Sequence, residues 1–242
     1  MEKPFAGKKA LVIGGTGGIG RAVALGLAER GAELTIHGGS SLERLENTLK
    51  TIKKLGGKGE GFLLSIDNLI RAEEIFARAP DPDILVCAWG PFRRAPLDRL
   101  DLEFWQGMVM GNLAFPGLVV SLALPKMIER NWGRILLFGG TNTDSIRGFL
   151  TSAAYSAAKT GLGVLAKSVA KHAAAQGISC NVICPGLTDT EYLDDNEKKY
   201  NRDLSPGNQA LSPENIAWFC MEILENPGIN GAVIPVDRGI SL

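Results

Sequence analysis

A glycine-rich turn between a short apolar strand and a helix constrains this chain more than any other feature. Residues 10–13 (Ala-Leu-Val-Ile) are an apolar run, as expected for a strand buried on both faces. Five glycines follow within residues 14–20, and residues 19–30 have the pattern of a helix. Backbone N–H groups at a helix start attract anions, and glycine lets a pyrophosphate approach the backbone. The sequence therefore favours a dinucleotide site over a plain strand-to-helix turn.

The composition limits both the size of the protein and its partners. Its 242 residues are 45% hydrophobic, which suits one α/β domain over residues 1–242. Because 26 basic side chains balance 26 acidic ones, no basic field is present to hold nucleic acid or an anionic membrane. Two histidines make a His-rich metal site unexpected, and we predict no metal.

The cysteines and the apolar segments indicate a cytoplasmic protein. The four cysteines show no CxxC spacing, and the first residues lack the apolar region of a signal peptide. The most apolar stretch, residues 113–125, is shorter than a membrane span and contains two prolines.

The rest of the chain alternates between strand and helix patterns, without repeats or long linkers. After the first unit, strands are expected at residues 33–37, 62–66, 84–88, 134–138, 179–183 and 232–236. Helices are expected at residues 42–55, 70–79, 102–130 with a bend near Pro116, 151–175 and 213–224. Such alternation predicts a parallel sheet covered on both faces, with ligands bound outside the carboxyl ends of the strands.

Tyr155 and Lys159 lie four residues apart in the longest helix pattern, so they share one helix face. A neighbouring ammonium favours the phenolate form of tyrosine, and such a pair can pass a proton at neutral pH. Taken alone, these two residues would more often be a chance pair on a solvated helix.

Four motifs in order resemble the short-chain dehydrogenase/reductase family from about residue 7 to the C-terminus. They are Gly14-x-x-x-Gly18-x-Gly20, Asn112 in the long helix, Tyr155-x-x-x-Lys159, and Pro185-Gly186-x-x-x-Thr190. The chain looks most like β-ketoacyl-(acyl carrier protein) reductase-like members. The resemblance implies a Rossmann-type, doubly wound, seven-stranded parallel sheet with helices on both faces, and a nicotinamide cofactor.

The resemblance also implies roles for individual residues. Tyr155 would be the general acid/base, Lys159 its pKa modulator and a ribose contact, and Asn112 the holder of a water in the proton relay. Pro185, Gly186, Thr188 and Thr190 would line the nicotinamide. The remaining cofactor contacts are expected at Gly14, Thr16, Gly17, Gly18, Ile19, Gly20, Asp67, Ala88, Trp89 and Gly90.

Two departures from the family pattern are apolar. Ile13 replaces the usual threonine before Gly14, and Cys87-Ala88-Trp89-Gly90 replaces the usual Asn-Asn-Ala-Gly. The threonine and an asparagine steady each other in the family, so we expect a coupled replacement by packing. Trp89 lies either beside the cofactor pocket or in the core.

A third departure concerns the catalytic serine that follows the fifth strand in the family. Counting forward from the strand places Gly139 or Gly140 at this position, whereas counting back from Tyr155 places Asn142 there. Thr141 is the nearest hydroxyl and the first candidate to replace the serine, and Asn142 is the second. Thr143 and Ser145 are weaker candidates, and the alternative is that these residues only make a turn.

The end of the second strand favours NADP(H) over NAD(H). It reads His37-Gly-Gly-Ser-Ser41 and lacks the carboxylate that binds the ribose hydroxyls of NAD. Ser40 and Ser41 can donate hydrogen bonds to a 2′-phosphate, and Arg44 or Arg21 could approach it. Asp67, or Ser65 in another alignment, would face the adenine unless it caps a helix.

The polar segment 187–211 is expected to cover the active site as a substrate lid. The substrate would be a small carbonyl or alcohol compound. It could also be an acyl thioester on an acidic carrier, bound through Arg93, Arg94 and Arg130, although such arginines are usually surface charges. Family members pair through the helices at 102–130 and 151–175, so a homodimer or homotetramer is expected.

These observations favour an NADP(H)-dependent carbonyl reductase or alcohol dehydrogenase. The main alternative is a catalytically weak relative that binds NADP(H) as a sensor or scaffold, because the serine is missing. A nucleotide-sugar epimerase is less favoured, since such enzymes need a larger C-terminal substrate domain.

Overall fold

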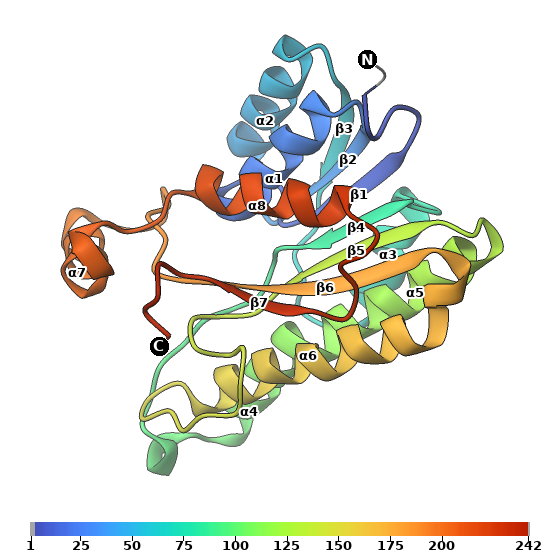
Figure 1. Cartoon of the computed structure of the whole chain (residues 1–242). Coiled ribbons are helices and arrows are strands. Elements are labelled where there is room, and N and C mark those ends of the chain that lie inside the picture. The colour runs from blue at the N-terminus through green and yellow to red at the C-terminus, as the bar shows by residue number, and fades with distance from the viewer. Residues whose placement is uncertain (1–2, 242) are drawn as a thin grey trace.

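A computed structural model describes residues 3–241, which contain one sheet of parallel strands. The strand order is β3-β2-β1-β4-β5-β6-β7 (Figure 1). The seven strands are β1 (Lys9–Ile13), β2 (Glu33–Gly38), β3 (Lys58–Leu63), β4 (Ile84–Cys87), β5 (Gly133–Phe138), β6 (Ile178–Pro185) and β7 (Val233–Val236). The predicted doubly wound, seven-stranded architecture is therefore confirmed.

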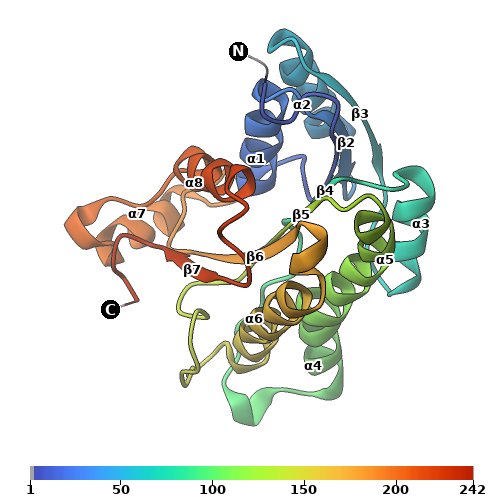
Figure 2. The ribbon, with the colours of Figure 1, turned by 45° about the vertical axis from the view of Figure 1, so that its right-hand side comes forward.

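Helices cover both faces of the sheet (Figures 1 and 2). One layer holds α1 (Gly18–Glu29), α2 (Leu42–Lys54) and α8 (Pro213–Glu225). The other holds α3 (Ile70–Arg78), α4 (Leu102–Val109), α5 (Phe115–Glu129) and α6 (Ala153–Ala173). The remaining helix, α7 (Asp195–Leu204), stands at the outer edge, on the left in Figure 1.

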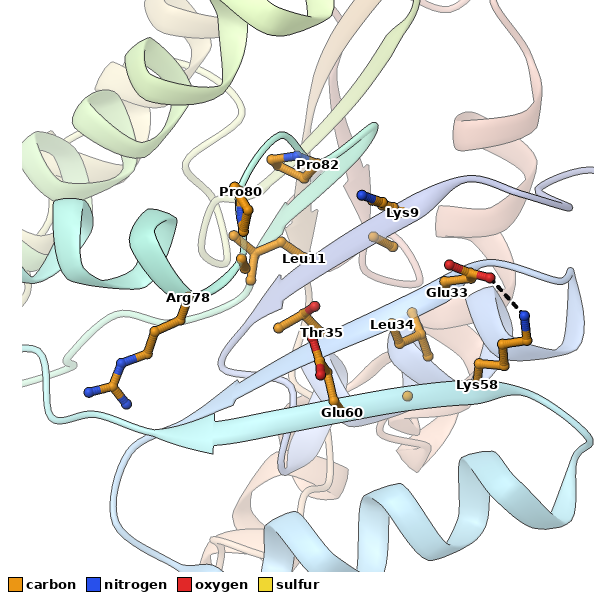
Figure 3. Close-up of a pocket in the computed structure, with 13 residues that line it drawn as sticks. Lys9, Leu11, Glu33, Leu34, Thr35, Lys58, Glu60, Arg78, Pro80 and Pro82 are labelled. Atoms are coloured by element: carbon orange, nitrogen blue, oxygen red, sulfur yellow. Dashed lines mark hydrogen bonds and ion pairs between the residues drawn. The ribbon is translucent and has the colours of Figure 1, made fainter.

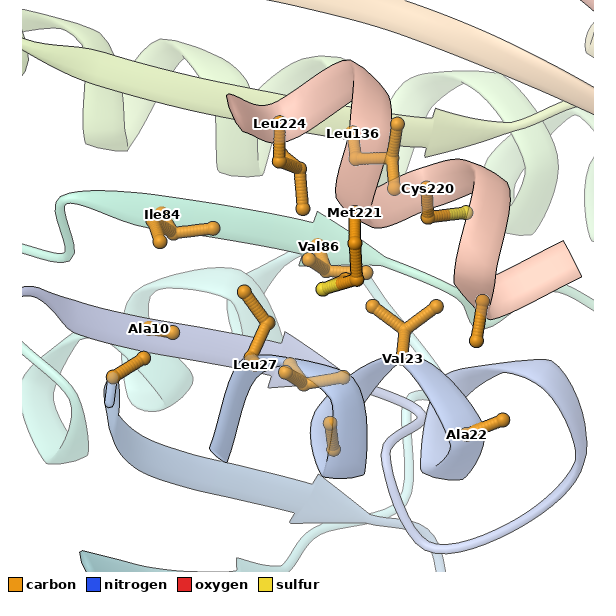
Figure 4. Packing of buried hydrophobic residues seen from close by; sticks show 14 of the residues in the cluster. Ala10, Ala22, Val23, Leu27, Ile84, Val86, Leu136, Cys220, Met221 and Leu224 are labelled. Carbon is orange, nitrogen blue, oxygen red and sulfur yellow. The ribbon is translucent and has the colours of Figure 1, made fainter. Parts of the chain in front are cut away.

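Side chains at alternate strand positions belong to two separate hydrophobic clusters, one on each face of the sheet. Val12 belongs to the cluster under α1 and α8, whereas Leu11 and Ile13 belong to the cluster under α5 and α6. Figure 4 shows the first cluster, in which Val23 of α1 and Met221 of α8 lie close together above the strands. Both faces of the strands are therefore buried, which explains why they appear as continuous apolar runs.

The third strand is the main error in the predicted elements. The strand was expected at residues 62–66, but β3 covers Lys58–Leu63 and pairs Gly61 with Ile36. β3 is an edge strand that begins with the exposed residues Lys58, Gly59 and Glu60. Polar side chains are common on edge strands, so apolar periodicity located this strand too late in the chain.

The predicted helix at 102–130 is interrupted before Pro116. A π-helical turn, η2 (Met110–Ala114), separates α4 from α5. By length and composition, Leu102–Glu129 could cross a membrane, and it is longer than the apolar stretch 113–125 that the sequence singles out. In the structure this element packs as a core helix, with Phe115, Val119 and Met127 buried in the second cluster.

The nine-residue helix α3 leaves a hollow of about 540 Å³ on its face of the sheet. Figure 3 shows Lys9, Glu33 and Lys58 at the amino ends of three adjacent strands around it. Ligands of open α/β sheets bind at the opposite, carboxyl ends. The functional site is therefore expected at the carboxyl ends of the strands.

Candidate functional site

The glycine turn lies where the sheet order reverses. It follows β1, and Ala88 and Gly90 follow the neighbouring strand β4. Gly14 has φ +80°, and a Cβ there would lie 3.0 Å from the carbonyl carbon of Ala88. A Cβ on Gly20 would lie 2.2 Å from the carbonyl oxygen of Gly14. Both positions therefore require glycine, and the turn sits at the point where doubly wound folds bind nucleotides.

The start of α1 carries a backbone N–H group that can bind an anion. No side chain of the N-cap residue Gly17 caps the helix, and the Gly18 N–H donates instead to Oε1 of Glu191, at 2.9 Å. Thr190 also lies beside Gly18. A carboxylate thus already occupies the position where a pyrophosphate would accept hydrogen bonds. The turn therefore fits a dinucleotide in shape and in charge.

His37 supports this turn, a role that the sequence analysis missed. The ring is fully buried, with Nε2 2.8 Å from the Leu64 carbonyl oxygen and Nδ1 3.4 Å from the Gly14 nitrogen. These contacts suit a neutral ring that donates from Nε2 and accepts at Nδ1. Burial lowers the pKa of His37.

We expect the free energy of unfolding to fall as the pH drops below about 6.5, the ordinary histidine pKa. Below that value the unfolded chain takes up a proton that the folded His37, with its lowered pKa, does not. The loss should approach about 1.4 kcal/mol per pH unit. Urea unfolding at pH 7.5 and 5.5 measures it. His37→Gln should reduce this difference, whereas replacing the exposed His172 should not. Equal differences in wild type and His37→Gln would contradict this account.

Two of the predicted catalytic residues meet around Gly90, and a third lies one helical turn away. Lys159 of α6 and Asn112 of η2 are both buried. A Cβ on Gly90 would lie 2.3 Å from Asn112 Oδ1 and 3.2 Å from Lys159 Nζ. Tyr155 lies one turn before Lys159 on α6. These residues therefore lie near the carboxyl end of β4, next to the glycine turn.

Asn112 is held by its amide nitrogen, which leaves its oxygen free. Nδ2 donates to the carbonyl oxygens of Pro91, at 2.8 Å, and Met108, at 3.1 Å. Oδ1 is buried without a hydrogen-bond partner among the described residues. Single π-helical turns are frequent at functional sites, and here the turn carries this acceptor.

Tyr155 and Lys159 are less closely coupled than their spacing suggests. Lys159 Nζ lies 5.8 Å from the centre of the Tyr155 ring and donates to the Phe138 carbonyl oxygen at 2.8 Å. Burial raises the pKa of Tyr155 to about 12 and lowers the pKa of Lys159 to about 8. The tyrosine is therefore protonated at neutral pH in this structure, as a proton donor requires.

Gly140, one of the two positions given by the forward count from β5, lies against Tyr155. A Cβ on Gly140 would lie 2.7 Å from the Tyr155 hydroxyl oxygen, so a side chain at residue 140 would meet the phenol. Thr141 donates to the Pro185 carbonyl oxygen at 3.0 Å. Thr143 is buried, and its hydroxyl accepts from the Gly140 N–H at 2.8 Å.

Asn142 differs from these two threonines. It has a left-handed backbone with φ +62°, and its Oδ1 is buried without a hydrogen-bond partner in the described part of the chain. Its side-chain amide therefore retains unused hydrogen-bonding capacity, whereas the two threonine hydroxyls are engaged.

Trp89 packs in the core layer. Its ring meets Phe115 of α5 edge-on, with centroids 5.4 Å apart, and also approaches Gly111. Ile13 belongs to the same hydrophobic cluster. The two apolar departures from the family pattern thus share one packing environment, which agrees with a coupled replacement.

Around the end of β2, Ser40 is exposed, and Ser41 Oγ caps α2 by accepting from the Arg44 N–H at 3.3 Å. Asp67 is exposed and paired with Arg71 at 2.9 Å, and this hydrogen bond lowers the pKa of Asp67. Thr16 lies against Gly38, where a Cβ would be 2.5 Å from its methyl carbon. Ile19 packs against the cluster under α1 and α8.

The residues after β6 lead directly back to the glycine turn. A Cβ on Gly186 would lie 2.6 Å from the Asp237 Cα, and Thr188 donates to the Gly186 carbonyl oxygen at 2.9 Å. The 187–211 segment is closed at its base by a bridge between Thr188 and Leu211. The segment therefore begins directly after Pro185 and Gly186 and contains Thr188 and Thr190, the other two residues predicted to line the nicotinamide.

Phe92 is a second residue that the sequence analysis missed. Its ring meets Tyr155 edge-on, with centroids 4.7 Å apart, and half of the residue remains exposed. It belongs to an irregular loop, where no periodicity indicates which side chains face the site.

Comparisons with known proteins agree with this geometry. A sequence model described as short chain dehydrogenase matches residues 8–201. The 3-oxoacyl-(acyl-carrier-protein) reductase of Aquifex aeolicus is 34% identical over 255 aligned positions, covering 99% of this chain and all of the relative. The Escherichia coli protein of the same name is 34% identical over 192 positions, or 77% of this chain and 76% of the relative.

Solved structures share the fold over nearly the whole chain. A 3-oxoacyl-(acyl-carrier-protein) reductase from Agrobacterium tumefaciens with NADP bound has a TM-score of 0.90 and 27% identity, covering 97% of this chain and 95% of its own. An acetoin dehydrogenase from Enterobacter cloacae has a TM-score of 0.86 and 26% identity, covering 96% and 95%. Proteins of this shape therefore carry names with different substrates.

Proposed function

The chain belongs to the short chain dehydrogenase family of oxidoreductases, and from that premise we propose that it transfers hydride between NADP(H) and a carbonyl or alcohol substrate. The observation that carries the proposal is the meeting of Asn112 and Lys159 at Gly90, one helical turn from Tyr155 and beside the glycine turn. This arrangement sets a protonated phenol next to a nucleotide site.

When bound, a nicotinamide would supply the hydride to the substrate carbon in reduction and accept it in oxidation. Tyr155 donates its phenolic proton to the carbonyl oxygen during reduction and takes it back during oxidation. The raised pKa of Tyr155 keeps this proton available at neutral pH. After each reduction Lys159 would return a proton to the phenolate through a water that accepts no proton from Asn112 but is held by its free Oδ1.

Asn142 is the residue that we propose in place of the serine. The family serine polarises the substrate carbonyl, and an amide N–H can serve the same purpose. Thr141, the first candidate from sequence, has its hydroxyl engaged with Pro185. The unpartnered atom of Asn142 is its oxygen Oδ1, which only accepts, so the proposed role requires the side-chain N–H of Asn142 to reach the substrate oxygen.

We expect NADPH to bind roughly tenfold or more tightly than NADH, because a 2′-phosphate would gain charge-assisted hydrogen bonds. Ser40, Ser41 and Arg44 lie at the start of α2, and residues 37–41 at the end of β2 include no carboxylate to bind ribose hydroxyls. Calorimetry with both nucleotides measures the preference. Arg44→Ala should reduce the ratio of the NADH dissociation constant to the NADPH dissociation constant. Equal affinities in the wild type would contradict the assignment.

We further propose that the substrate is a 3-oxoacyl thioester on a carrier. The two relatives described above are named for this reaction, which supports the class. Phe92, Ile146 and Leu150 are exposed apolar side chains on two loops joined by a hydrogen bond from Ala95 to Thr151, and they could contact an acyl chain. Arg93 and Arg94 lie on the first of these loops and could meet an acidic carrier.

A substrate panel tests this function. NADPH oxidation by the purified protein is followed with ketones, diketones, quinones and β-ketoacyl thioesters. Turnover that is fastest with the thioesters is expected, and turnover of another class alone would refute the carrier proposal. Tight NADPH binding with no turnover would favour the second candidate, a nucleotide-binding sensor or scaffold, which the absence of a side chain at Gly140 motivates.

We also propose a cytoplasmic homodimer or homotetramer. The buried cysteines are all free thiols, as a reducing compartment would keep them. α5 and α6 would form the contacts between subunits, and Val164 on α6 is 70% exposed.

A further inference from the structure

The anion site at the start of α1 is filled by the chain itself. Glu191, from the 187–211 segment, accepts a hydrogen bond from the Gly18 N–H at 2.9 Å. The two residues are 173 positions apart, so this contact is made by folding the segment back across the glycine turn. An N–H that holds a carboxylate cannot at the same time hold a phosphate oxygen at full strength, and the two anions repel each other.

Tyr192 makes a second contact with the same turn. The position of a Cβ on Gly17 would lie 2.0 Å from the Tyr192 hydroxyl oxygen and 2.6 Å from Glu191 Oε1. Gly17 has φ −165°, an extended conformation that any residue adopts, so its backbone does not require glycine. The absence of a side chain at residue 17 is explained by the segment packed upon it.

A third contact involves a cation. The guanidinium of Arg44 lies over the Tyr192 ring, 4.6 Å from its centre. Arg44 is also the side chain proposed above to approach the 2′-phosphate. The segment therefore engages groups at both ends of the proposed phosphate-binding path, the Gly18 N–H and Arg44.

We propose that Glu191 and Tyr192 form an autoinhibitory contact, and that NADP(H) binds only after this contact opens. The proposal rests on the nucleotide site proposed above. The nucleotide phosphates take over the Gly18 N–H, and Arg44 leaves Tyr192 for the 2′-phosphate. The bound nucleotide thereby keeps the 187–211 segment from returning to this contact, which couples cofactor loading to the open state of the proposed substrate lid.

The first arm of the test measures nucleotide affinity. Glu191→Ala should lower the NADPH dissociation constant by about three- to tenfold, the range expected for removing a competing anion at a partly exposed helix start. Asp195→Ala is the matched control, since Asp195 is an exposed acid on the same segment. An equal gain in Asp195→Ala would reduce the effect to general charge repulsion and overturn the specific contact, as would no gain in Glu191→Ala.

The second arm needs no nucleotide. Hydrogen–deuterium exchange is measured on peptides covering residues 14–22 and 188–194. Both should exchange severalfold faster in Glu191→Ala and Gly17→Ala than in wild type and Asp195→Ala, because the contact that protects them is lost. Unchanged exchange in both variants would overturn the autoinhibitory contact. If exchange shows the contact but neither the wild type nor any variant binds NADPH, the proposed nucleotide site is wrong and the Glu191–Gly18 contact still stands.

Discussion

Replacing Tyr155 by phenylalanine is expected to lower kcat for carbonyl reduction by about 100- to 10,000-fold. The hydroxyl is the proposed proton donor, and burial keeps it protonated by raising the pKa of Tyr155 to about 12. Phenylalanine preserves the ring that packs edge-on against Phe92. The NADPH dissociation constant should therefore stay nearly unchanged, because the phosphate contacts proposed at the glycine turn do not involve the phenol. Initial rates and calorimetry on the same preparation measure both quantities.

The matched control is Tyr200→Phe, because Tyr200 is a half-exposed tyrosine on α7. Its kcat should equal that of the wild type. Turnover in Tyr155→Phe within a fewfold of the wild type would mean that the proton comes from another group, and the proposed mechanism would be wrong.

Gly20→Ala should have the largest effect on folding. The added Cβ would lie 2.2 Å from the Gly14 carbonyl oxygen and 3.1 Å from the Ala88 Cβ. The first clash is with backbone, so it is relieved only by separating α1 from the turn after β1. We expect a loss of about 3 kcal/mol in the free energy of unfolding, the upper range for overpacking, together with loss of NADPH binding. Urea unfolding and nucleotide titration measure these effects.

Gly26→Ala provides the control on the same helix. A Cβ there would meet the Met221 sulfur at 3.1 Å, and this flexible side chain can move aside. Its stability should change by no more than about 1 kcal/mol, because alanine is the better helix former. Similar losses in both variants would show that the Gly14–Gly20 contact has no special role.

Much of the fold is predictable because the central strands obey a simple physical rule. β1, β4 and β5 are buried on both faces, so their sequences are continuous apolar runs between helices. The edge strand β3 escapes this rule, since half of its residues are exposed and its pairing is set by β2. An interruption near Pro116 was predictable from the proline, but the π-helical form of the turn at Met110–Ala114 was not, because it depends on how the backbone hydrogen bonds are shifted.

The candidate site was predictable where its residues follow local spacing. Tyr155 and Lys159 lie on one helix face, and the glycine turn follows from its place between a strand and a helix. Asn112 comes from the family resemblance. The engagement of Lys159 by the Phe138 carbonyl could not be predicted, because it depends on the path of another strand. The same holds for His37 against Gly14 and for Glu191 against Gly18, which are contacts between distant segments. The proximity of Gly140 to Tyr155 also could not be predicted, because it depends on the path of the loop after β5.

The most direct test of the central claim is deuteride transfer. The protein is incubated with NADPH carrying deuterium at the reactive nicotinamide carbon and with a mixture of β-ketoacyl thioesters and ketones, and the alcohol products are analysed by mass spectrometry. We predict one deuterium on the carbinol carbon of the product in the wild type and far less product with Tyr155→Phe. Saturating NADPH binding without any deuterated alcohol from this mixture would contradict the account and favour a protein that binds the nucleotide without using it.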